Sequence, residues 1–209
     1  MTLASCDSRK TAGENPFFTE WDTPHGVPPF DKILPEHFMP AFERGMSLHE
    51  AEIDAITSNK DEATFENTIL AYDNAGQMLA QTELVFGMLC AAETNDRMQA
   101  LQEQAMPLLA AHRDKIRLDD KLFVRVKEVY DRRAALGLDA EQMRLLQKTY
   151  DSFVRAGALL DAEQKARLKE INGQLSLTAV KFGNNILAEN NNFVLELKSD
   201  ELDGLPAGI

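Results

Sequence analysis

The sequence predicts an all-α protein, and three observations carry that prediction. Apolar residues recur at three-, four- and seven-residue spacings through most of the chain, which is the period of an amphipathic helix. Two of these runs follow an Asp-x-x-Gln pair, which resembles a capping box at a helix start. Only one short stretch alternates like a strand, and no convincing partner strand is present. We therefore expect a multi-helix domain with one short terminal strand.

Residues 15–33, NPFFTEWDTPHGVPPFDKI, contain too many prolines for a helix. We expect an extended arm whose aromatic rings pack on the body of the protein. A first helix begins near Pro35 and Pro40, because a missing N–H does least harm in the first turn. Its apolar positions are Phe38, Phe42, Met46, Ile53 and Ile56. A second helical stretch is expected over residues 64–93, with Gly76 as a break.

A third helix is predicted to start at Thr94 or Asn95 and to end near Arg117, with Pro107 predicting a kink. The second half of the chain has clearer signals. A fourth helix is expected over residues 119–137, where Gly137 is placed for a C-terminal cap. Two further helices are expected to begin at capping boxes, and the last is expected to end near residue 189. The capping pairs are Asp139 with Gln142 and Asp161 with Gln164.

The predicted strand lies near the end of the chain. Its apolar side would carry Phe193, Leu195 and Leu197, which alternate with Val194, Glu196 and Lys198.

Composition excludes two classes of partner. Lys plus Arg is 22 and Asp plus Glu is 34, so the formal net charge is 22 − 34 = −12. Nucleic-acid binding needs clusters of Lys and Arg, and no basic run offsets the negative charge. We therefore expect no nucleic-acid partner. No apolar stretch approaches the roughly 20 residues that a membrane-spanning helix needs.

The pair His49-Glu50 resembles half of the H-E-x-x-H pattern of zinc peptidases. That chemistry requires a second histidine four residues after the first, and Ile53 occupies this position. We expect His49 to face solvent. The other histidines show no ligand spacing, and two cysteines cannot form a zinc framework. We assign no catalytic, cofactor-binding or metal-ligating residue to this chain and expect no cofactor in it.

Cys6 is the one candidate for modification. Leu3-Ala4-Ser5-Cys6 resembles a lipobox, in which the cysteine of a bacterial lipoprotein is lipidated, although the charged and apolar regions of a signal peptide are missing. We interpret residues 1–14 as a disordered lead-in with a lipobox remnant and residues 15–209 as the helical domain. This predicts a periplasmic or lipid-tethered protein whose membrane contact is the lipid anchor alone. The alternative is a chance match in a cytoplasmic protein.

Several short motifs, taken in order, resemble the thimet oligopeptidase family of zinc metallopeptidases, which includes neurolysin, oligopeptidase A and the bacterial peptidyl-dipeptidases. The motifs are Phe30-Asp31-Lys32-Ile33, His37-Phe38, Pro40-Ala41, Thr64-Phe65-Glu66-Asn67-Thr68-Ile69, Phe182-Gly183-Asn184-Asn185-Ile186-Leu187 and Glu201-Leu202-Asp203-Gly204-Leu205-Pro206. The arm is most similar to the peptidyl-dipeptidase branch. The resemblance covers nearly everything from Asn15 to Pro206, and the Phe-Glu-Asn-Thr-Ile element is its most specific part.

The resemblance implies a longer parent protein whose zinc ligands and catalytic glutamate lie in a C-terminal domain. This chain would then be the N-terminal, neurolysin-like domain, inactive alone, which forms one wall of a channel for short peptides. Its partners would be the catalytic domain and, in the parent, peptide substrates, with zinc as the parent's cofactor. The alternative is a stand-alone helical module that binds peptides or a protein without hydrolysing them.

Overall fold

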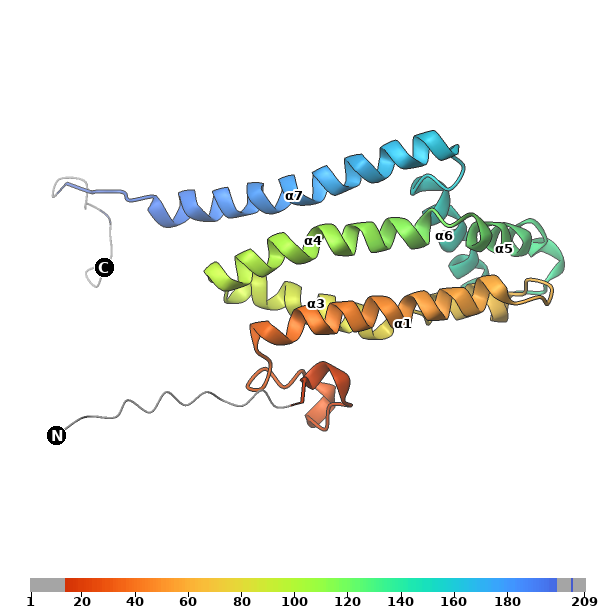
Figure 1. Ribbon diagram of the computed structural model, residues 1–209, viewed down its shortest axis with the longest axis horizontal. Helices are drawn as coiled ribbons and strands as arrows, with labels where there is room; N and C mark the ends of the chain where they lie inside the picture. The colour runs from red at the N-terminus through yellow and green to blue at the C-terminus, as the bar shows by residue number, and fades with distance from the viewer. Residues whose placement is uncertain (1–13, 199–203, 205–209) are drawn as a thin grey trace.

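The computed structural model describes residues 14–198 and residue 204, and its regular structure is helical throughout the described part (Figure 1). The all-α prediction is confirmed. The long helices are α1 (Phe38–Ser58), α3 (Gln77–Ala92), α4 (Asp96–Arg117), α5 (Asp120–Asp131), α6 (Ala140–Arg155) and α7 (Ala162–Asn192). Short turns complete the fold, namely η1 (Pro16–Phe18), η2 (Pro24–Gly26), η3 (Pro35–His37), η4 (Phe65–Leu70), α2 (Ala71–Asp73) and η5 (Arg133–Ala135).

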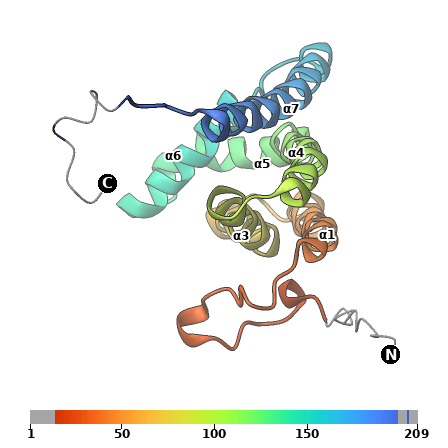
Figure 2. The same cartoon turned by 90° about the vertical axis from the view of Figure 1, so that its left-hand side faces the viewer.

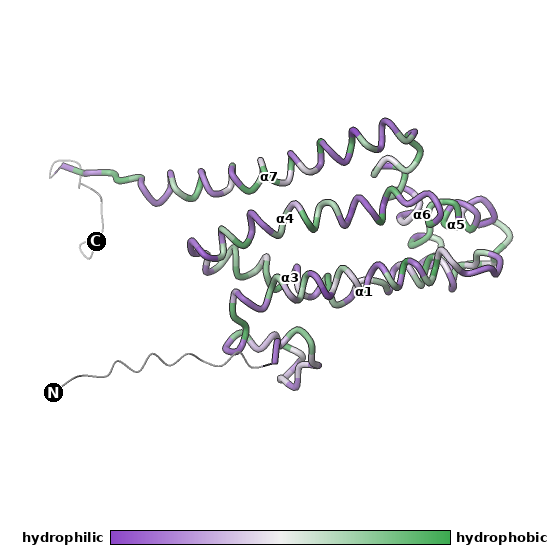
Figure 3. The backbone as a smooth tube through the Cα atoms, in the orientation of Figure 1, coloured by the Kyte–Doolittle hydropathy of each residue, from purple (hydrophilic) through white to green (hydrophobic). Residues whose placement is uncertain are grey.

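Helices α1, α3 and α4 lie side by side and form the centre of the molecule (Figures 1 and 2). Helices α5 and α6 pack together at one end of this group, and α7 lies along α4 as an outer layer. We call residues 38–155, from α1 to α6, the body. In Figure 3 apolar and polar positions alternate along the helices of the body, which agrees with the amphipathic period of the sequence.

The predicted arm packs its rings on the body. Phe17 is buried, and its ring centroid lies 5.3 Å from that of Phe38 on α1. The indole N–H of Trp21 donates to the carbonyl of Pro16 at 2.9 Å, which folds the arm back on itself. This arm closes a first core formed by Phe17, Ile33, Phe38, Ala41, Phe42, Leu79, Val85, Phe86, Met98, Ala105 and Leu109.

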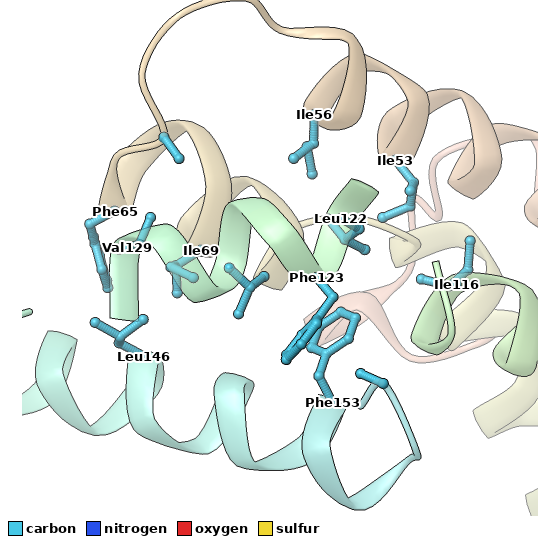
Figure 4. Close-up of a cluster of buried hydrophobic side chains, with 13 residues drawn as sticks. Ile53, Ile56, Phe65, Ile69, Ile116, Leu122, Phe123, Val129, Leu146 and Phe153 are labelled. Atoms are coloured by element: carbon cyan, nitrogen blue, oxygen red, sulfur yellow. The ribbon is translucent and has the colours of Figure 1, made fainter. Parts of the chain in front are cut away.

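A second core joins α5 and α6 to the ends of α1 and α4 (Figure 4). Its buried members are Ile53, Ile56, Ala63, Phe65, Ile69, Ile116, Leu122, Phe123, Val126, Val129, Leu146, Phe153 and Ala158. Phe65 and Ile69 belong to the Phe-Glu-Asn-Thr-Ile element, so this motif is a packing element. The element forms η4, a π-helical turn of a kind that is rare and short in proteins.

Asn67 explains why η4 keeps this form. Its Oδ1 accepts hydrogen bonds from the backbone N–H of Thr64 at 2.8 Å, the hydroxyl of Thr68 at 2.8 Å and Nη2 of Arg125 at 3.1 Å. Arg125 is buried and also donates from Nη1 to the carbonyls of Asn59 at 3.0 Å and Asp61 at 3.1 Å. One arginine on α5 therefore holds the loop before η4 and η4 itself.

The predicted helix starts are confirmed at four caps. Asn95, Asp119, Asp139 and Asp161 each accept a hydrogen bond from a backbone N–H in the first turn of the helix that follows. The pairs Asp139 with Gln142 and Asp161 with Gln164 form complete capping boxes. Pro107 lies within α4, which continues on both sides of it.

Two predicted helix ends differ from the structure. Helix α5 ends at Asp131, before Gly137, where the carbonyl of Tyr130 accepts from the backbone N–H of Arg132 and from Arg133 Nη1 at 2.8 Å. These donors satisfy one of the carbonyls that have no regular partner at a helix end. Helix α7 runs to Asn192, slightly beyond the predicted residue 189.

The predicted terminal strand is wrong. Residues 193–198 have no strand pairing, and Phe193, Val194 and Leu195 are 73%, 76% and 69% exposed. Alternation alone predicts which side chains share a face, but a strand needs a neighbouring backbone for its hydrogen bonds. No strand occurs elsewhere among residues 14–198 to provide one.

Candidate functional site

A pair of histidines joins α1 to α4 in the centre of the body. The Nε2 atom of His112 lies 3.0 Å from Nδ1 of His49, and the two ring centroids are 5.1 Å apart. His112 is 5% exposed, and His49 is partly buried. The prediction that His49 faces solvent is therefore wrong. The sequence held a signal for this, since Phe42, Met46, His49, Ile53 and Ile56 continue one stripe at alternating spacings of four and three.

Charged groups surround this pair, which we call the histidine junction. Glu50 Oε1 on α1 lies 3.5 Å from His112 Nδ1, and Lys115 Nζ on α4 lies 2.8 Å from Glu50 Oε2. Burial is the main cause that lowers the pKa of both histidines. The charge of Glu50 opposes this lowering of the pKa at His112, and His112 further lowers the pKa of His49. Burial therefore favours a neutral pair in which one ring nitrogen donates to the other.

Gly76 closes the histidine junction from the turn between α2 and α3. It has φ +75°, a conformation that favours glycine, and it forms the predicted break. A Cβ atom at this position would lie 3.0 Å from His49 Nδ1. The N–H of Gly76 donates to Oε2 of Glu52 at 2.6 Å. A carboxylate of α1 therefore also fixes the turn between α2 and α3.

A small cavity of about 190 Å³ adjoins the junction and is lined by His49, Tyr72, Gly76, Glu83, His112 and Arg117 among others. Ligand pockets in proteins usually measure about 300–1,000 Å³, so this cavity is too small for a peptide. The junction joins three elements through polar contacts and contains neither a serine nor a cysteine nucleophile. Its chemistry is the sharing and uptake of protons.

The described residues do not fit a zinc site. Ile53, at the position of the second histidine of H-E-x-x-H, is 3% exposed and lies in the second core. Among residues 14–198, no group of three or more His, Cys, Asp and Glu side chains is placed to hold a metal ion. The two junction histidines direct Nε2 and Nδ1 at each other, and a hydrogen bond at 3.0 Å explains that geometry without a metal.

Helix α7 presents a second candidate surface. Ile171, Leu175, Phe182 and Ile186 are spaced four, seven and four residues apart, which places them on one side of the helix. They are 42%, 62%, 65% and 46% exposed, and we call them the α7 stripe. Only Lys165 and Val180 are buried among the 31 residues of the helix. Exposed apolar side chains on one side of a helix make this side a candidate packing surface.

Polar contacts fix another side of α7 on the body. Asn172 Nδ2 donates to Asp114 Oδ1 on α4 at 2.8 Å. Lys165 forms an ion pair with Asp120 at the start of α5. Because these contacts hold the helix on α4, the α7 stripe is presented in a defined direction.

The predicted lipidation residue, Cys6, lies outside the described residues. Cys90 on α3 is partly buried, and burial raises the pKa of its thiol, which makes it a weak nucleophile. Within the part of the chain that the structure describes, none of the helices is both long enough and apolar enough to span a membrane.

Comparison with curated proteins finds peptidases. The chain is 41% identical to dipeptidyl carboxypeptidase of Escherichia coli over 176 residues, which are 84% of this chain and 26% of that protein. It is 38% identical to dipeptidyl carboxypeptidase of Salmonella typhimurium over 174 residues and 24% identical to Escherichia coli oligopeptidase A over 185 residues. No family model matches the chain. The chain spans about a quarter of the length of the curated relatives that it matches.

Proposed function

This chain belongs to the family of peptidases that includes dipeptidyl carboxypeptidase and oligopeptidase A, and we propose that it is the N-terminal, non-catalytic channel wall of a peptidyl-dipeptidase. One observation carries the proposal. The 41% identity extends over 84% of this chain but over only 26% of the relative. A match of this kind is expected when one domain of a larger enzyme is compared with the whole enzyme.

The α7 stripe is an observation in favour of a partner domain. In the proposal, the catalytic domain packs on Ile171, Leu175, Phe182 and Ile186, which the body leaves uncovered. The body then forms a rigid wall, because its two cores join α1 to α6. A rigid wall opposite the catalytic residues limits the substrate to short peptides and closes over them.

Zinc and the groups that act on the peptide bond belong, in this proposal, to the catalytic domain. Ile53 and the hydrogen-bonded histidine junction argue against a zinc site in the described residues. We assign the chain the tasks of shaping the channel and orienting its partner domain.

The proposal is tested with the gene and with the purified chain. The reading frame after Ile209 should encode an H-E-x-x-H motif and a further acidic ligand. The 209-residue chain should bind no stoichiometric zinc and cleave no short peptide, whereas the longer product should do both. One tightly held zinc per 209-residue chain, or cleavage that a chelator abolishes, would contradict the proposal.

The alternative is a stand-alone module that binds peptides or a protein without hydrolysis. The open α7 stripe is the observation that favours it, since nothing in the described residues covers these side chains. A stop codon directly after Ile209 would support this module and contradict the channel wall.

We also propose that Cys6 is lipidated, and that the lipid tethers the protein to a membrane on the periplasmic side. The sequence Leu3-Ala4-Ser5-Cys6 supports this proposal. In the native host, the wild-type protein should fractionate with membranes and Cys6→Ala should be released, because each buried CH₂ of a lipid contributes about 0.8 kcal/mol. A wild-type protein found in the soluble fraction would favour the cytoplasmic alternative.

A further inference from the structure

Four cations gather in one groove at the junction of α4 and α6. Arg144, Lys148 and Arg155 lie on one side of α6, and Arg117 joins them from the C-terminal end of α4. In Figure 1 this end of α4 reaches the region of α6. The groove has a volume of about 470 Å³, and Asp151 is its one acidic lining residue. We call it the basic groove.

The basic groove differs in charge from the rest of the chain. Its lining carries four positive charges and one negative charge, or +3, in a protein with a net charge of −12. Among the described residues, none of its four cations forms an ion pair with a carboxylate. Asp151 Oδ1 instead accepts a hydrogen bond from Gln147 at 2.9 Å.

Some other cations of this chain lie beside carboxylates: Arg97 lies 3.1 Å from Glu36, and Lys115 lies 2.8 Å from Glu50. The basic groove differs because four cations without such a partner among the described residues line one hollow. Like charges that stand together without counter-charges repel one another and destabilise the folded state. An anion bound in the basic groove would remove that repulsion.

We propose that the basic groove binds an acidic polypeptide segment through its carboxylates. Arg144 and Lys148 are four residues apart, and Lys148 and Arg155 are seven apart, which correspond to about 6 Å and about 10 Å along the helix. An extended peptide advances about 3.3 Å per residue and points alternate side chains to the same face, so side chains two residues apart match the first spacing. The best ligand therefore carries Asp or Glu at positions i and i+2, opposite Arg144 and Lys148, and Arg155 and Arg117 add positive charge beside it.

A peptide fits these observations better than a nucleic acid. The net charge of −12 repels a long polyanion, whereas a short acidic segment meets mainly the local field of the groove. The guanidinium groups of Arg144 and Arg155 match the geometry of carboxylates and form paired hydrogen bonds with them. The inference does not depend on the catalytic half of the proposed peptidase, because it concerns binding alone.

The test measures binding of fluorescent peptides to the 209-residue chain by fluorescence anisotropy. The probe is a glycine–serine peptide of about ten residues with Glu at i and i+2, and its control has Gln at the same positions. The Glu peptide should bind, the Gln peptide should not, and added salt should weaken the binding. Replacing Arg144, Lys148 and Arg155 together by Gln should weaken it by about tenfold, because each exposed pair contributes modestly.

A matched variant carries the same change of charge elsewhere. Lys32, Lys169 and Lys181 are exposed, and replacing all three by Gln should leave the affinity for the Glu peptide within about twofold of wild type. Circular dichroism verifies the fold of both variants. If the triple groove variant does not fold, Lys148→Gln alone replaces it, with an expected loss of about two- to threefold.

Three results would overturn the proposal. The first is equal binding of the Glu and Gln peptides. The second is an equal loss of affinity in the groove variant and the matched variant, which would indicate a general effect of net charge. The third is binding of heparin or RNA without binding of the Glu peptide, which would identify the occupant as a polyanion.

Discussion

Helices α6 and α7 begin in the same way. Asp139 and Asp161 each accept a hydrogen bond from the backbone N–H of the glutamine three residues later, and each glutamine side chain completes the capping box. Their environments then differ. Helix α6 buries Leu146, Thr149 and Phe153 within 16 residues, whereas α7 buries only Lys165 and Val180 within 31.

The difference shows that local signals and packing are separate sources of helix structure. A capping box satisfies N–H groups at the helix start wherever the helix lies. Most helical stability in proteins comes from packing an apolar face, and α6 packs its face on α5 and η4. Helix α7 has only α4 as a major neighbour, so its stripe is left for a further surface.

Two alanine substitutions should show the largest difference between α6 and α7 in their effect on the free energy of unfolding. Phe153→Ala removes a ring that is fully buried in the second core, and it should lower the free energy of unfolding by about 3–5 kcal/mol. Phe182→Ala removes a ring of the α7 stripe that is 65% exposed, and it should change that free energy by less than about 0.5 kcal/mol. Urea denaturation of the 209-residue chain measures both. Equal losses would show that α7 is as well packed as α6.

Substitutions of two arginines should give the next largest difference in unfolding free energy. Arg125→Met removes the buried donor to the carbonyls of Asn59 and Asp61 and one of the three donors to Asn67 Oδ1. We expect a loss of about 2–3 kcal/mol in unfolding free energy. Arg144→Met, on the exposed side of α6, should change it by less than about 0.5 kcal/mol. A loss below about 0.5 kcal/mol for Arg125→Met would show that other residues hold η4.

The histidine junction belongs to the body, so it should make the free energy of unfolding depend on pH. Both histidines have a pKa below their ordinary value of 6.5, so the unfolded chain takes up protons first as the pH falls. Their contribution to stability is full above about pH 6.5 and is lost as the pH falls below it. Unfolding free energies measured from pH 7 to pH 5 should therefore decrease.

The variant His112→Gln should flatten that decrease between pH 7 and pH 5. The matched variant His25→Gln changes an exposed histidine of the arm and should leave the decrease as it is. A decrease that is the same in wild type and in His112→Gln would assign the pH dependence to other groups. The carboxylate of Glu50 is a weak competitor in this range, since its pKa is lowered from 4.5.

The same comparison explains what the sequence could predict. Helix starts are local, so Asn95, Asp119, Asp139 and Asp161 could be assigned from neighbouring residues alone. The aromatic arm and the break at Gly76 were also predicted, because proline and glycine restrict or free the backbone at their own positions.

Contacts between distant residues could not be predicted in this way. His49 meets His112 across 63 positions, and Arg125 meets Asn59 across 66. A helical period places His49 on the apolar stripe of α1, but it does not show which side chain of α4 lies opposite. The basic groove was missed for the same reason, since Arg117 is far in sequence from the cations of α6.

The packing of a catalytic domain on α7 is tested most directly by comparing hydrogen exchange of the α7 stripe in two polypeptides. Amide hydrogen exchange is measured over residues 171–186 in the 209-residue chain and in the product of the reading frame extended beyond Ile209. If the catalytic domain covers the stripe, exchange of this segment should slow by at least about tenfold in the longer product, while residues 146–153 of α6 change little. Equal exchange of residues 171–186 in both polypeptides would contradict the role of this chain as a channel wall that packs through α7.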